Sequence, residues 1–568
     1  MPECENEDEG GARETEWERF SSALLLSPTL ANMTKTFRLA LILPLAFLAA
    51  FYFYPLAAIL QTSFASGNAF NELVSEPYYA RVFAFTIFQA ALSTLITLIA
   101  ALPAAYIFAR YDFRGASILR ALTTIPFLMP TIVVATAFSA LLGPRGILNL
   151  ALMQLLQLES PPIQILNTLA IIVLAHTFYN FTIVLRIVGG FWANLDPQLE
   201  SAARVLGANR WQTFWHITLP LIAPAIIAAA LLVFIFDFTS FGVILILGGP
   251  RLATLEVEIY RQTVNLFNLP LAATLSLVQL IATFTLMLIY TRLQARLARP
   301  LRLRPVTIVR RTLRTWREKI LVWGYLGAML IFLLTPLLAI VVASFEEGLT
   351  YYTELFVNRR GAITFVPPIE AVRNSLLFAG ATIGLAVSLG LVAAYAIASH
   401  RASFLDSIFM LPLGTSAITL GFGYIIALGN WRTSVWLVPI AHTLVAFPFV
   451  VRSLLPMVRS IQPQLRNAAQ LLGASPARVW REIDLPIILR AILVGAVFAF
   501  VISLGEFAAT TLVARPDFPT ITLAIYRFLG QPGAINFGQA LALATILMLI
   551  SGIAIVAMER LRIGETEF

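Results

Sequence analysis

Two acidic residues stand inside long apolar stretches of the chain, where an ionisable side chain is costly. Asp237 lies in the apolar run 220–247, and Glu506 lies in the run 486–513. An ionisable residue at membrane depth normally faces protein or a water-filled cavity, so these carboxylates predict a cation pathway or a gate held by hydrogen bonds. The alternative is a structural role, in which each carboxylate caps a helix or joins two helices at the membrane edge.

The histidines His176 and His442 also lie in apolar runs, and they are 266 positions apart in equivalent sequence contexts. A single histidine in a membrane helix is more typical of an interhelical hydrogen bond than of a ligand site. Asn180, one helical turn after His176, has the same two interpretations.

The sequence offers little for catalytic or cofactor chemistry. Its two lysines, Lys35 and Lys319, follow Thr34 and Glu318, so a G-x-x-x-x-G-K-[ST] phosphate loop is excluded. The single cysteine, Cys4, excludes an intramolecular disulfide and a thiolate metal cluster. Four histidines without an H-E-x-x-H motif give little to build a metalloenzyme from. We therefore expect a protein that is not an enzyme, with no catalytic residues, no cofactor and no metal site.

A 25-residue segment occurs twice, at 196–220 and 462–486, in a frame of Ala-Ala, three residues, Gly, nine residues, then Ile-x-Leu-Pro. The alanines leave a short helix with a low-relief face that can enter a groove on a partner. The glycine permits a left-handed turn, and the proline suits the first turn of the next helix. Each copy is a polar loop between apolar runs, which predicts a duplicated docking site at the membrane surface. Its residues are Ala202, Ala203, Gly207, Ile217, Leu219, Pro220, Ala468, Ala469, Gly473, Ile483, Leu485 and Pro486.

Composition indicates a membrane protein. Hydrophobic residues make up 59% of the chain, charged residues 12%, and mean hydropathy is +0.83. The net charge of +9 would suggest nucleic-acid binding in a soluble protein, but most of the excess arginine sits beside apolar runs, where orientation explains it. We therefore expect contact with membrane lipid and none with nucleic acid.

Apolar runs of the length that crosses a bilayer predict an all-α polytopic bundle. Twelve spans are expected in two sets of six, and an even number gives both sets the same orientation, as a parallel repeat. The predicted spans are 39–61, 83–108, 118–142, 167–192, 220–247, 270–292, 320–344, 374–398, 407–429, 434–458, 486–513 and 536–558.

The predicted domains follow from these spans. Residues 1–32 form an acidic disordered tail, 33–292 a first transmembrane domain, 293–319 a basic cytoplasmic linker and 320–568 a second transmembrane domain. Most basic residues fall on one side of the predicted spans, which places both termini in the cytoplasm. Met33, followed by a short basic stretch, is an expected alternative start.

The duplicated frame resembles the cytoplasmic EAA loop of permease subunits of ATP-binding-cassette importers. Every position matches except the leading Glu, which is Ser201 in the first copy and Asn467 in the second. This resemblance implies a type I permease in a bacterial or archaeal plasma membrane. It also implies an extracytoplasmic solute-binding protein outside, and two ATPase copies docked on the loops inside.

The fused two-copy arrangement looks most like permeases for thiamine and for iron(III). The strings that carry this likeness are SFGVILILGGP at 240–250, TLEVEIY at 254–260 and GEFAATTLVARPDFPTITLAIY at 505–526. The alternative function is a secondary transporter of the major-facilitator type, which also has twelve spans in two parallel sets of six.

Overall fold

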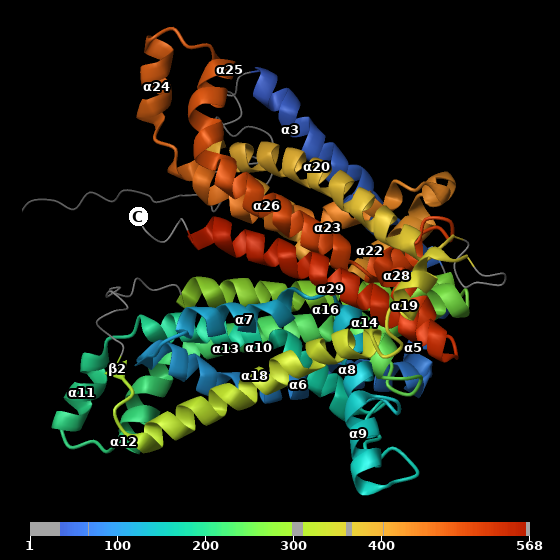
Figure 1. Ribbon diagram of the computed structural model, residues 1–568. Coiled ribbons are helices and arrows are strands. Elements are labelled where there is room, and N and C mark those ends of the chain that lie inside the picture. The colour runs from blue at the N-terminus through green and yellow to red at the C-terminus, as the bar shows by residue number, and fades with distance from the viewer. Residues whose placement is uncertain (1–34, 66, 298–310, 359–365, 401–402, 564–568) are drawn as a thin grey trace, which may run out of the picture.

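The computed structural model describes residues 35–563 apart from 66, 298–310, 359–365 and 401–402. The expected acidic tail 1–32, the alternative start at Met33 and much of the linker 293–319 lie outside the described residues. The described part is a bundle of helices (Figure 1), and its two strands, β1 (Tyr111–Asp112) and β2 (Arg311–Thr312), form one short parallel pair. The predicted all-α class is confirmed.

The helices of the first copy run in the order expected for six spans with short connecting helices. They are α3 (Lys35–Leu48), α4 (Tyr54–Ala65), α5 (Gly67–Ser75), α6 (Pro77–Arg110), α7 (Ala116–Leu128), α8 (Thr131–Leu142), α9 (Ile147–Leu156), α10 (Leu169–Ala193), α11 (Pro197–Val205), α12 (Arg210–Thr213), α13 (Leu219–Phe238), α14 (Gly242–Leu247), α15 (Leu255–Tyr260) and α16 (Leu269–Leu297).

The second copy repeats this order. Its helices are α18 (Trp316–Ser344), α19 (Thr350–Thr353), α20 (Ile369–His400), α21 (Ser403–Met410), α22 (Ala417–Ala427), α23 (Leu437–Ser460), α24 (Pro463–Leu471), α25 (Pro476–Val479), α26 (Leu485–Gly505), α27 (Ala508–Val513), α28 (Ile521–Leu529) and α29 (Ala534–Ile563). Among the described residues, eleven helical segments are long and apolar enough to cross a membrane, and a bent pair brings the number to twelve.

The third span of each copy departs from the continuous helices that the sequence predicts over 118–142 and 407–429. In the first copy the segment long and apolar enough to cross a membrane is Thr131–Leu156, and Ala116–Phe127 is a separate, shorter apolar helix. In the first copy α7 and α8 are separated at Met129 and Pro130, where the chain is extended. Proline has no N–H, and it disfavours helical geometry in the residue before it. In the second copy the helices on either side of the break meet at 92°, and the Ser416 side chain accepts hydrogen bonds from the first free amides of α22.

The fifth spans end earlier than predicted. The helix expected over 220–247 ends at Phe238, and the one expected over 486–513 ends at Gly505. A short separate helix follows each, α14 in the first copy and α27 in the second. Asp237 and Glu506 therefore lie at breaks in the backbone rather than in the middle of a continuous span.

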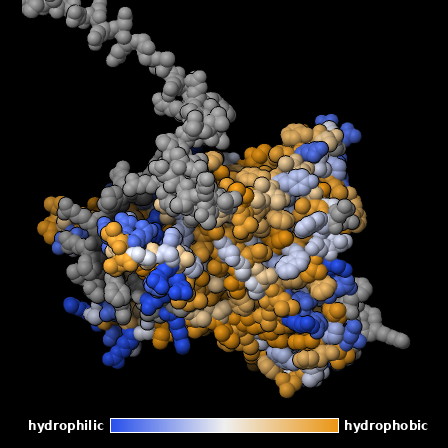
Figure 2. Space-filling model, turned by 90° about the horizontal axis from the view of Figure 1, so that it is seen from above, coloured by the Kyte–Doolittle hydropathy of each residue, from blue (hydrophilic) through white to orange (hydrophobic). Residues whose placement is uncertain are grey.

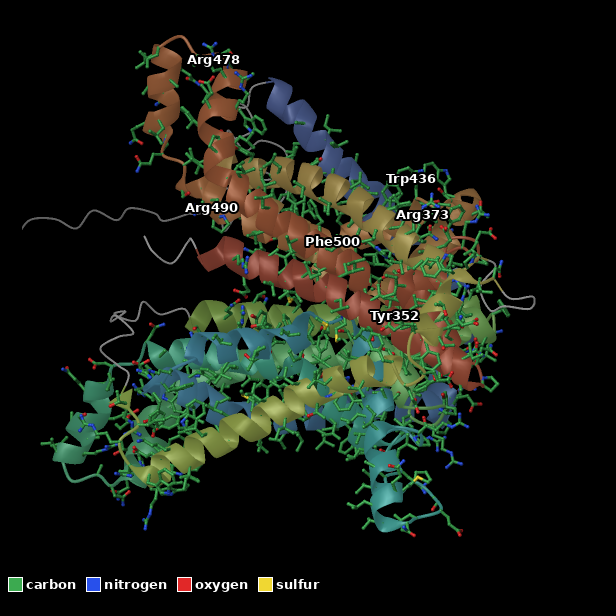
Figure 3. The ribbon with its side chains drawn as sticks, viewed as in Figure 1. Tyr352, Arg373, Trp436, Arg478, Arg490 and Phe500 are labelled. Carbon is green, nitrogen blue, oxygen red and sulfur yellow. The ribbon has the colours of Figure 1, made fainter. Side chains whose placement is uncertain are left out.

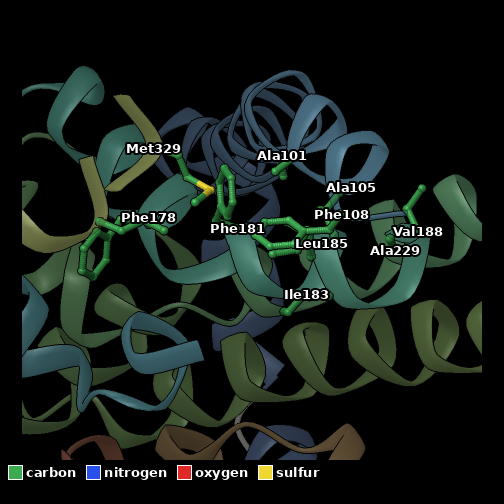
Figure 4. Close-up of a cluster of buried hydrophobic side chains, with 14 of the residues drawn as sticks. Ala101, Ala105, Phe108, Phe178, Phe181, Ile183, Leu185, Val188, Ala229 and Met329 are labelled. Carbon is green, nitrogen blue, oxygen red and sulfur yellow. The ribbon is translucent and has the colours of Figure 1, made fainter. Parts of the chain in front are cut away.

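The first span of each copy packs against the other copy. Helices α3 and α4 lie on α20 and α22, while α18 lies on α8 and also touches α6 and α7. The Tyr52 hydroxyl donates to the Leu411 carbonyl oxygen at 3.1 Å, and the Tyr325 hydroxyl donates to the Ala100 carbonyl oxygen. Figure 4 shows Met329 of α18 beside the aromatic side chains of α10 in the largest buried cluster. The two copies therefore share their hydrophobic cores.

The surface is arranged for a bilayer. In Figure 2 hydrophobic residues spread across the middle of the visible face, and hydrophilic residues gather toward its two ends. Many large apolar side chains on the spans are exposed, including Ile331 at 68% and Ile553 at 71%. Because the spans bury only part of their apolar surface inside the protein, lipid must cover the rest.

Candidate coupling segments and translocation pocket

Two helical projections extend from one end of the bundle, α11 with α12 and α24 with α25 (Figure 1). Neither α11 nor α24 buries a side chain. In the first projection the Asp196 carboxylate caps α11 by accepting from the Gln198 amide at 2.9 Å, and Pro197 occupies the first turn. Figure 3 shows Arg478 on the second projection and Arg490 nearer the bundle. We call 196–220 and 462–486 the coupling segments.

The glycine of each repeated frame makes the turn that ends the first helix of its coupling segment. Gly207 has φ +93° and Gly473 has φ +82°, the left-handed region that the sequence pattern predicts. An added Cβ would meet no heavy atom within 4 Å at either position. The constraint on both residues is therefore in the backbone rather than in the packing.

The end of each coupling segment joins its membrane helix through one wide helical turn. Ile217 lies in the π-helical turn 214–218, and Ile483 lies in the turn 480–484. Leu219 and Leu485 follow as the first residues of α13 and α26, and Pro220 and Pro486 lie in the first turns of these helices. A proline cannot donate to the preceding turn, and the wide turn accommodates that missing bond. Movement of a coupling segment is thus connected directly to the fifth span.

Two apolar pairs on the coupling segments were not singled out by the sequence analysis. Val205 and Leu206 are 87% and 88% exposed, and the equivalent Leu471 and Leu472 are both 89% exposed. Each pair directly precedes the glycine of the turn, so the recurrence of two aliphatic residues before Gly was the available signal. Apolar side chains this exposed on a polar projection indicate a surface that a partner protein covers.

Equivalent positions of the two coupling segments, Glu200 and Arg466, form ion pairs of opposite polarity: the first pair holds its segment to α6, and the second lies within its own segment. In the first copy the Glu200 carboxylate accepts from Arg110 at 2.7 Å and from the Thr218 hydroxyl at 3.1 Å. In the second copy Arg466, which is equivalent to Glu200, donates twice to Asp484 at 2.9 Å. These hydrogen bonds raise the pKa of Arg466.

Breaking the Arg466–Asp484 ion pair should reduce order in the second coupling segment. Arg466→Glu places two carboxylates together and should weaken the segment by about 1–2 kcal/mol, a modest value because Arg466 is 32% exposed. Amide hydrogen exchange across 462–486 should then be about tenfold faster per 1.4 kcal/mol lost. The double variant Arg466→Asp with Asp484→Arg restores opposite charges and should return exchange toward the wild-type rate. Equal exchange in all three proteins would contradict this role.

Asp237 and Glu506 both line one pocket of about 240 Å³ between the copies, together with His176 and Asn180. The remaining lining residues come from the same helix breaks and from α8 and α10: Thr131, Tyr179, Phe236, Thr239, Ser240, Phe241, Gly242, Val243, Gly505, Phe507 and Ala508. The fold therefore brings the two predicted path residues, 269 positions apart in sequence, to one cavity.

Asp237 has one engaged oxygen and one free oxygen. Its Oδ1 accepts from the Asn180 side-chain amide at 2.7 Å and lies 3.4 Å from His176 Nδ1. Its Oδ2 has no hydrogen-bond partner in the described structure, although the residue is 1% exposed. An unsatisfied buried carboxylate oxygen is costly, which is the expected property of a binding group rather than of a structural one.

Glu506 is fully engaged in structure. Its Oε1 accepts from the Ala509 amide at 2.9 Å, and its Oε2 accepts from the Thr510 amide at 2.9 Å and from the Thr510 hydroxyl at 2.7 Å. These are the free donors at the start of α27, where a negative charge is favoured. The hydrogen bonds therefore give different roles to two carboxylates that are equivalent by sequence alone.

Substitution by the matching amide should distinguish the two. Glu506→Gln replaces one acceptor oxygen with a donor facing backbone amides, which should lower the free energy of unfolding by about 1–3 kcal/mol. Asp237→Asn keeps an oxygen toward Asn180 and replaces an oxygen that has no hydrogen-bond donor, so stability should be unchanged or higher. Thermal unfolding of the purified variants in detergent measures both. Equal destabilisation by the two substitutions would remove the distinction.

Each histidine lies near one carboxylate. The position that holds the acid in one copy holds a serine hydroxyl in the other. His176 lies near Asp237 and bonds Ser240 through Nε2 at 2.9 Å. The residue equivalent to Asp237 is Ser503, whose hydroxyl lies 2.8 Å from Nδ1 of His442, and the residue equivalent to Ser240 is Glu506. Both histidines thus make interhelical hydrogen bonds, as their symmetry suggested.

Equivalent aromatic residues meet across the join between the copies. The rings of Phe241 and Phe507 are stacked with centroids 5.6 Å apart and planes inclined by 28°. Tyr260 packs edge-on against Phe241, and the equivalent Tyr526 packs edge-on against Phe507. This aromatic cluster closes one wall of the pocket.

A further buried acid, Glu256, was missed because it lies in a short connection with no distinctive spacing. Its carboxylate accepts from Gln279 at 2.8 Å and from the Ser416 hydroxyl at 2.6 Å, so it links the first copy to the helix break of the second. No group of three or more His, Cys, Asp or Glu side chains suited to a metal ion occurs among the residues described.

A duplicated bundle of membrane-spanning helices, with paired projections at one end and a polar pocket between its halves, defines a membrane permease. The sequence model described as "Binding-protein-dependent transport system inner membrane component" matches residues 101–303 and 386–561, once in each copy. The chain belongs to this family. It is accordingly a multi-pass inner-membrane permease component of an ATP-binding-cassette importer.

The relatives of the chain include thiamine and sulfate permeases. The "Thiamine transport system permease protein ThiP" of Escherichia coli (strain K12) is 27% identical over 514 residues, covering 86% of this chain and 90% of that protein. ThiP of Brucella abortus (strain 2308) is 27% identical over 501 residues, covering 85% and 88%. The "Sulfate transport system permease protein CysT" of Escherichia coli (strain K12) is 29% identical over 266 residues, covering 46% of this chain and 94% of that protein.

The solved structures that are similar to part of the chain include a transporter complex. It is a bacterial alginate ABC transporter in complex with an alginate pentasaccharide-bound periplasmic protein. The matched chain is 19% identical with a TM-score of 0.39, and the match covers 50% of this chain and 96% of the other.

Proposed function

We propose that the chain forms the complete translocation path for thiamine in an ATP-driven importer. The proposal is supported by the ThiP relatives, which match this chain over nearly their whole length and across both copies. The sulfate permease matches less than half of the chain. Iron(III), the other substrate suggested by the sequence, is not named among these relatives.

The coupling segments are the proposed docking sites for two copies of a separate ATPase subunit. Their alanines, Ala202 with Ala203 and Ala468 with Ala469, keep one helix face low, and the exposed pairs before Gly207 and Gly473 supply apolar contact area. ATP-driven closure of the ATPases would then move each fifth span through its wide helical turn. An extracytoplasmic solute-binding protein would deliver the substrate at the opposite end.

This function requires a particular orientation and division of the chain. Both termini and the coupling segments would face the cytoplasm of a bacterial or archaeal cell, in accordance with the distribution of basic residues. The units 33–292 and 320–568 would act as the two halves of the pore, joined by the basic linker 293–319. Asp237 would line the translocation path, and Glu506 would hold the geometry of the same cavity.

Transport by the reconstituted complex tests the proposal. The full chain is purified with its ATPase and solute-binding protein and placed in liposomes, and uptake of radiolabelled thiamine is compared with uptake of radiolabelled iron(III). We expect thiamine uptake that requires ATP and the binding protein, and ATPase activity that rises with thiamine-loaded binding protein. Uptake by the chain without an ATPase would instead favour a major-facilitator mechanism, and iron-dependent stimulation alone would overturn the substrate.

A further inference from the structure

The pocket between the copies is lined by one carboxyl oxygen without a hydrogen-bond donor and by several aromatic side chains. Its volume of about 240 Å³ lies just below the usual range for small-molecule sites, which begins at about 300 Å³. Four aromatic residues line it: Tyr179, Phe236, Phe241 and Phe507. A cavity of this kind can enclose a flat organic molecule. The carboxyl group in the cavity wall determines which chemical class of molecule binds.

Among the described residues that line the pocket, one carboxylate oxygen is available to a ligand. Oδ2 of Asp237 is buried in the pocket wall without a donor, whereas both oxygens of Glu506 accept from the start of α27. A ligand that brings one positive charge would satisfy Asp237 Oδ2 and favour the ionised form of that carboxyl group. Iron(III) prefers several hard oxygen ligands, which a single free oxygen does not supply.

The aromatic faces decide between a compact and a delocalised cation. Phe241 and Phe507 line the pocket and stack on each other at the join, with Tyr260 packed edge-on against Phe241 and Tyr526 edge-on against Phe507. A cation over an aromatic face is attracted by the ring quadrupole, and the attraction grows when water is excluded. A flat ring with a delocalised charge can use both the carboxylate and the aromatic faces because it loses little hydration on entering.

We propose that this pocket is a transmembrane binding site for flat aromatic cations with a single delocalised positive charge. The proposal rests on the transport function above, because it states which part of thiamine the permease recognises, the charged thiazolium ring. Asp237 holds the charge, Phe241 and Phe507 hold the ring, and Glu506 keeps the start of α27 in place beside them.

Binding to the full chain with its ATPase in lipid nanodiscs, without the solute-binding protein, tests the site by calorimetry. Three probes separate charge from shape: thiamine, a thiamine analogue with a neutral thiophene ring in place of thiazolium, and N-benzylpyridinium, an aromatic cation unrelated to thiamine. Both cations should bind, and the neutral analogue should bind about 10-fold to 100-fold more weakly.

Variants of the pocket residues show which side chains bind the cation. Asp237→Asn should weaken both cations about 10-fold to 100-fold and leave the neutral analogue unchanged, so the analogue reports that the pocket remains folded. Phe241→Leu and Phe507→Leu should each weaken the cations about 3-fold to 30-fold. Phe238→Leu is the matched control, because Phe238 is a buried phenylalanine next to Asp237 at the end of α13 but does not line the pocket. Its cation affinity should equal that of the wild type.

The outcomes distinguish failure of the proposed binding site from failure of the proposed transport of thiamine. Binding of N-benzylpyridinium that depends on Asp237, in a complex that does not transport thiamine, would support the site and overturn the substrate. Transport of thiamine with wild-type affinity and rate in Asp237→Asn and both phenylalanine variants would overturn the site and leave the substrate standing. Equal binding of the neutral and charged probes, or no binding of either cation, would also overturn the site.

Discussion

Replacing both Gly207 and Gly473 by valine should abolish transport while the protein still inserts in the membrane. Both residues hold a left-handed backbone conformation, and a β-branched residue there costs on the order of 1–3 kcal/mol. The strain is relieved if the turn opens, which moves the exposed first helix of the coupling segment away from the second. Each single variant should slow ATP-driven uptake about tenfold or more. Some uptake should remain, because the other coupling segment is unchanged.

Gly348→Val is the matched control for this prediction. Gly348 also has a positive φ, +65°, and open space around an added Cβ, but it lies between α18 and α19 rather than in a coupling segment. It therefore carries the same kind of strain at a different place. Normal uptake in the double variant, or equal loss in Gly348→Val, would show that the two turns are not specifically involved in coupling.

Leu206→Asp together with Leu472→Asp should prevent the ATPase from copurifying with the permease. Both side chains are almost fully exposed in the chain alone, so the fold does not depend on them. If a partner buries them, each contributes about 1.5–3 kcal/mol to binding, and a carboxylate in its place would be desolvated without a counter-charge. We expect a loss of affinity of more than 100-fold in the double variant, measured by titrating the purified ATPase onto the permease in nanodiscs.

Leu155→Asp provides the comparison, because Leu155 is 78% exposed on α9, outside the coupling segments. ATPase affinity should be unchanged in that variant. The unfolding temperature of both variants should match that of the wild type, since no buried contact is lost. An undiminished affinity in the Leu206 and Leu472 variant would place the ATPase contact elsewhere.

The sequence by itself determined the features that depend on local pattern. The length of each apolar run predicts a span because a helix needs that length to cross lipid, and no distant residue is required. The duplicated frame around Gly207 and Gly473 likewise predicts two identical turns, and the backbone at both positions is left-handed. The helix breaks were less visible, although Pro130 in the first copy is a local signal that the prediction of a continuous span overlooked.

Only the tertiary structure decided how the two copies interlock and which polar groups remain free. The exchange of first spans, seen in the contact of Tyr52 with Leu411, joins residues more than 350 positions apart, and no local period encodes such a contact. In sequence Asp237 and Glu506 are two similar acids near the ends of equivalent runs. The backbone break after Gly505 presents the free amides of α27 to Glu506, while the fold leaves Oδ2 of Asp237 without a donor. A hydrogen bond depends on position in space, and that position exists only once the helices have packed.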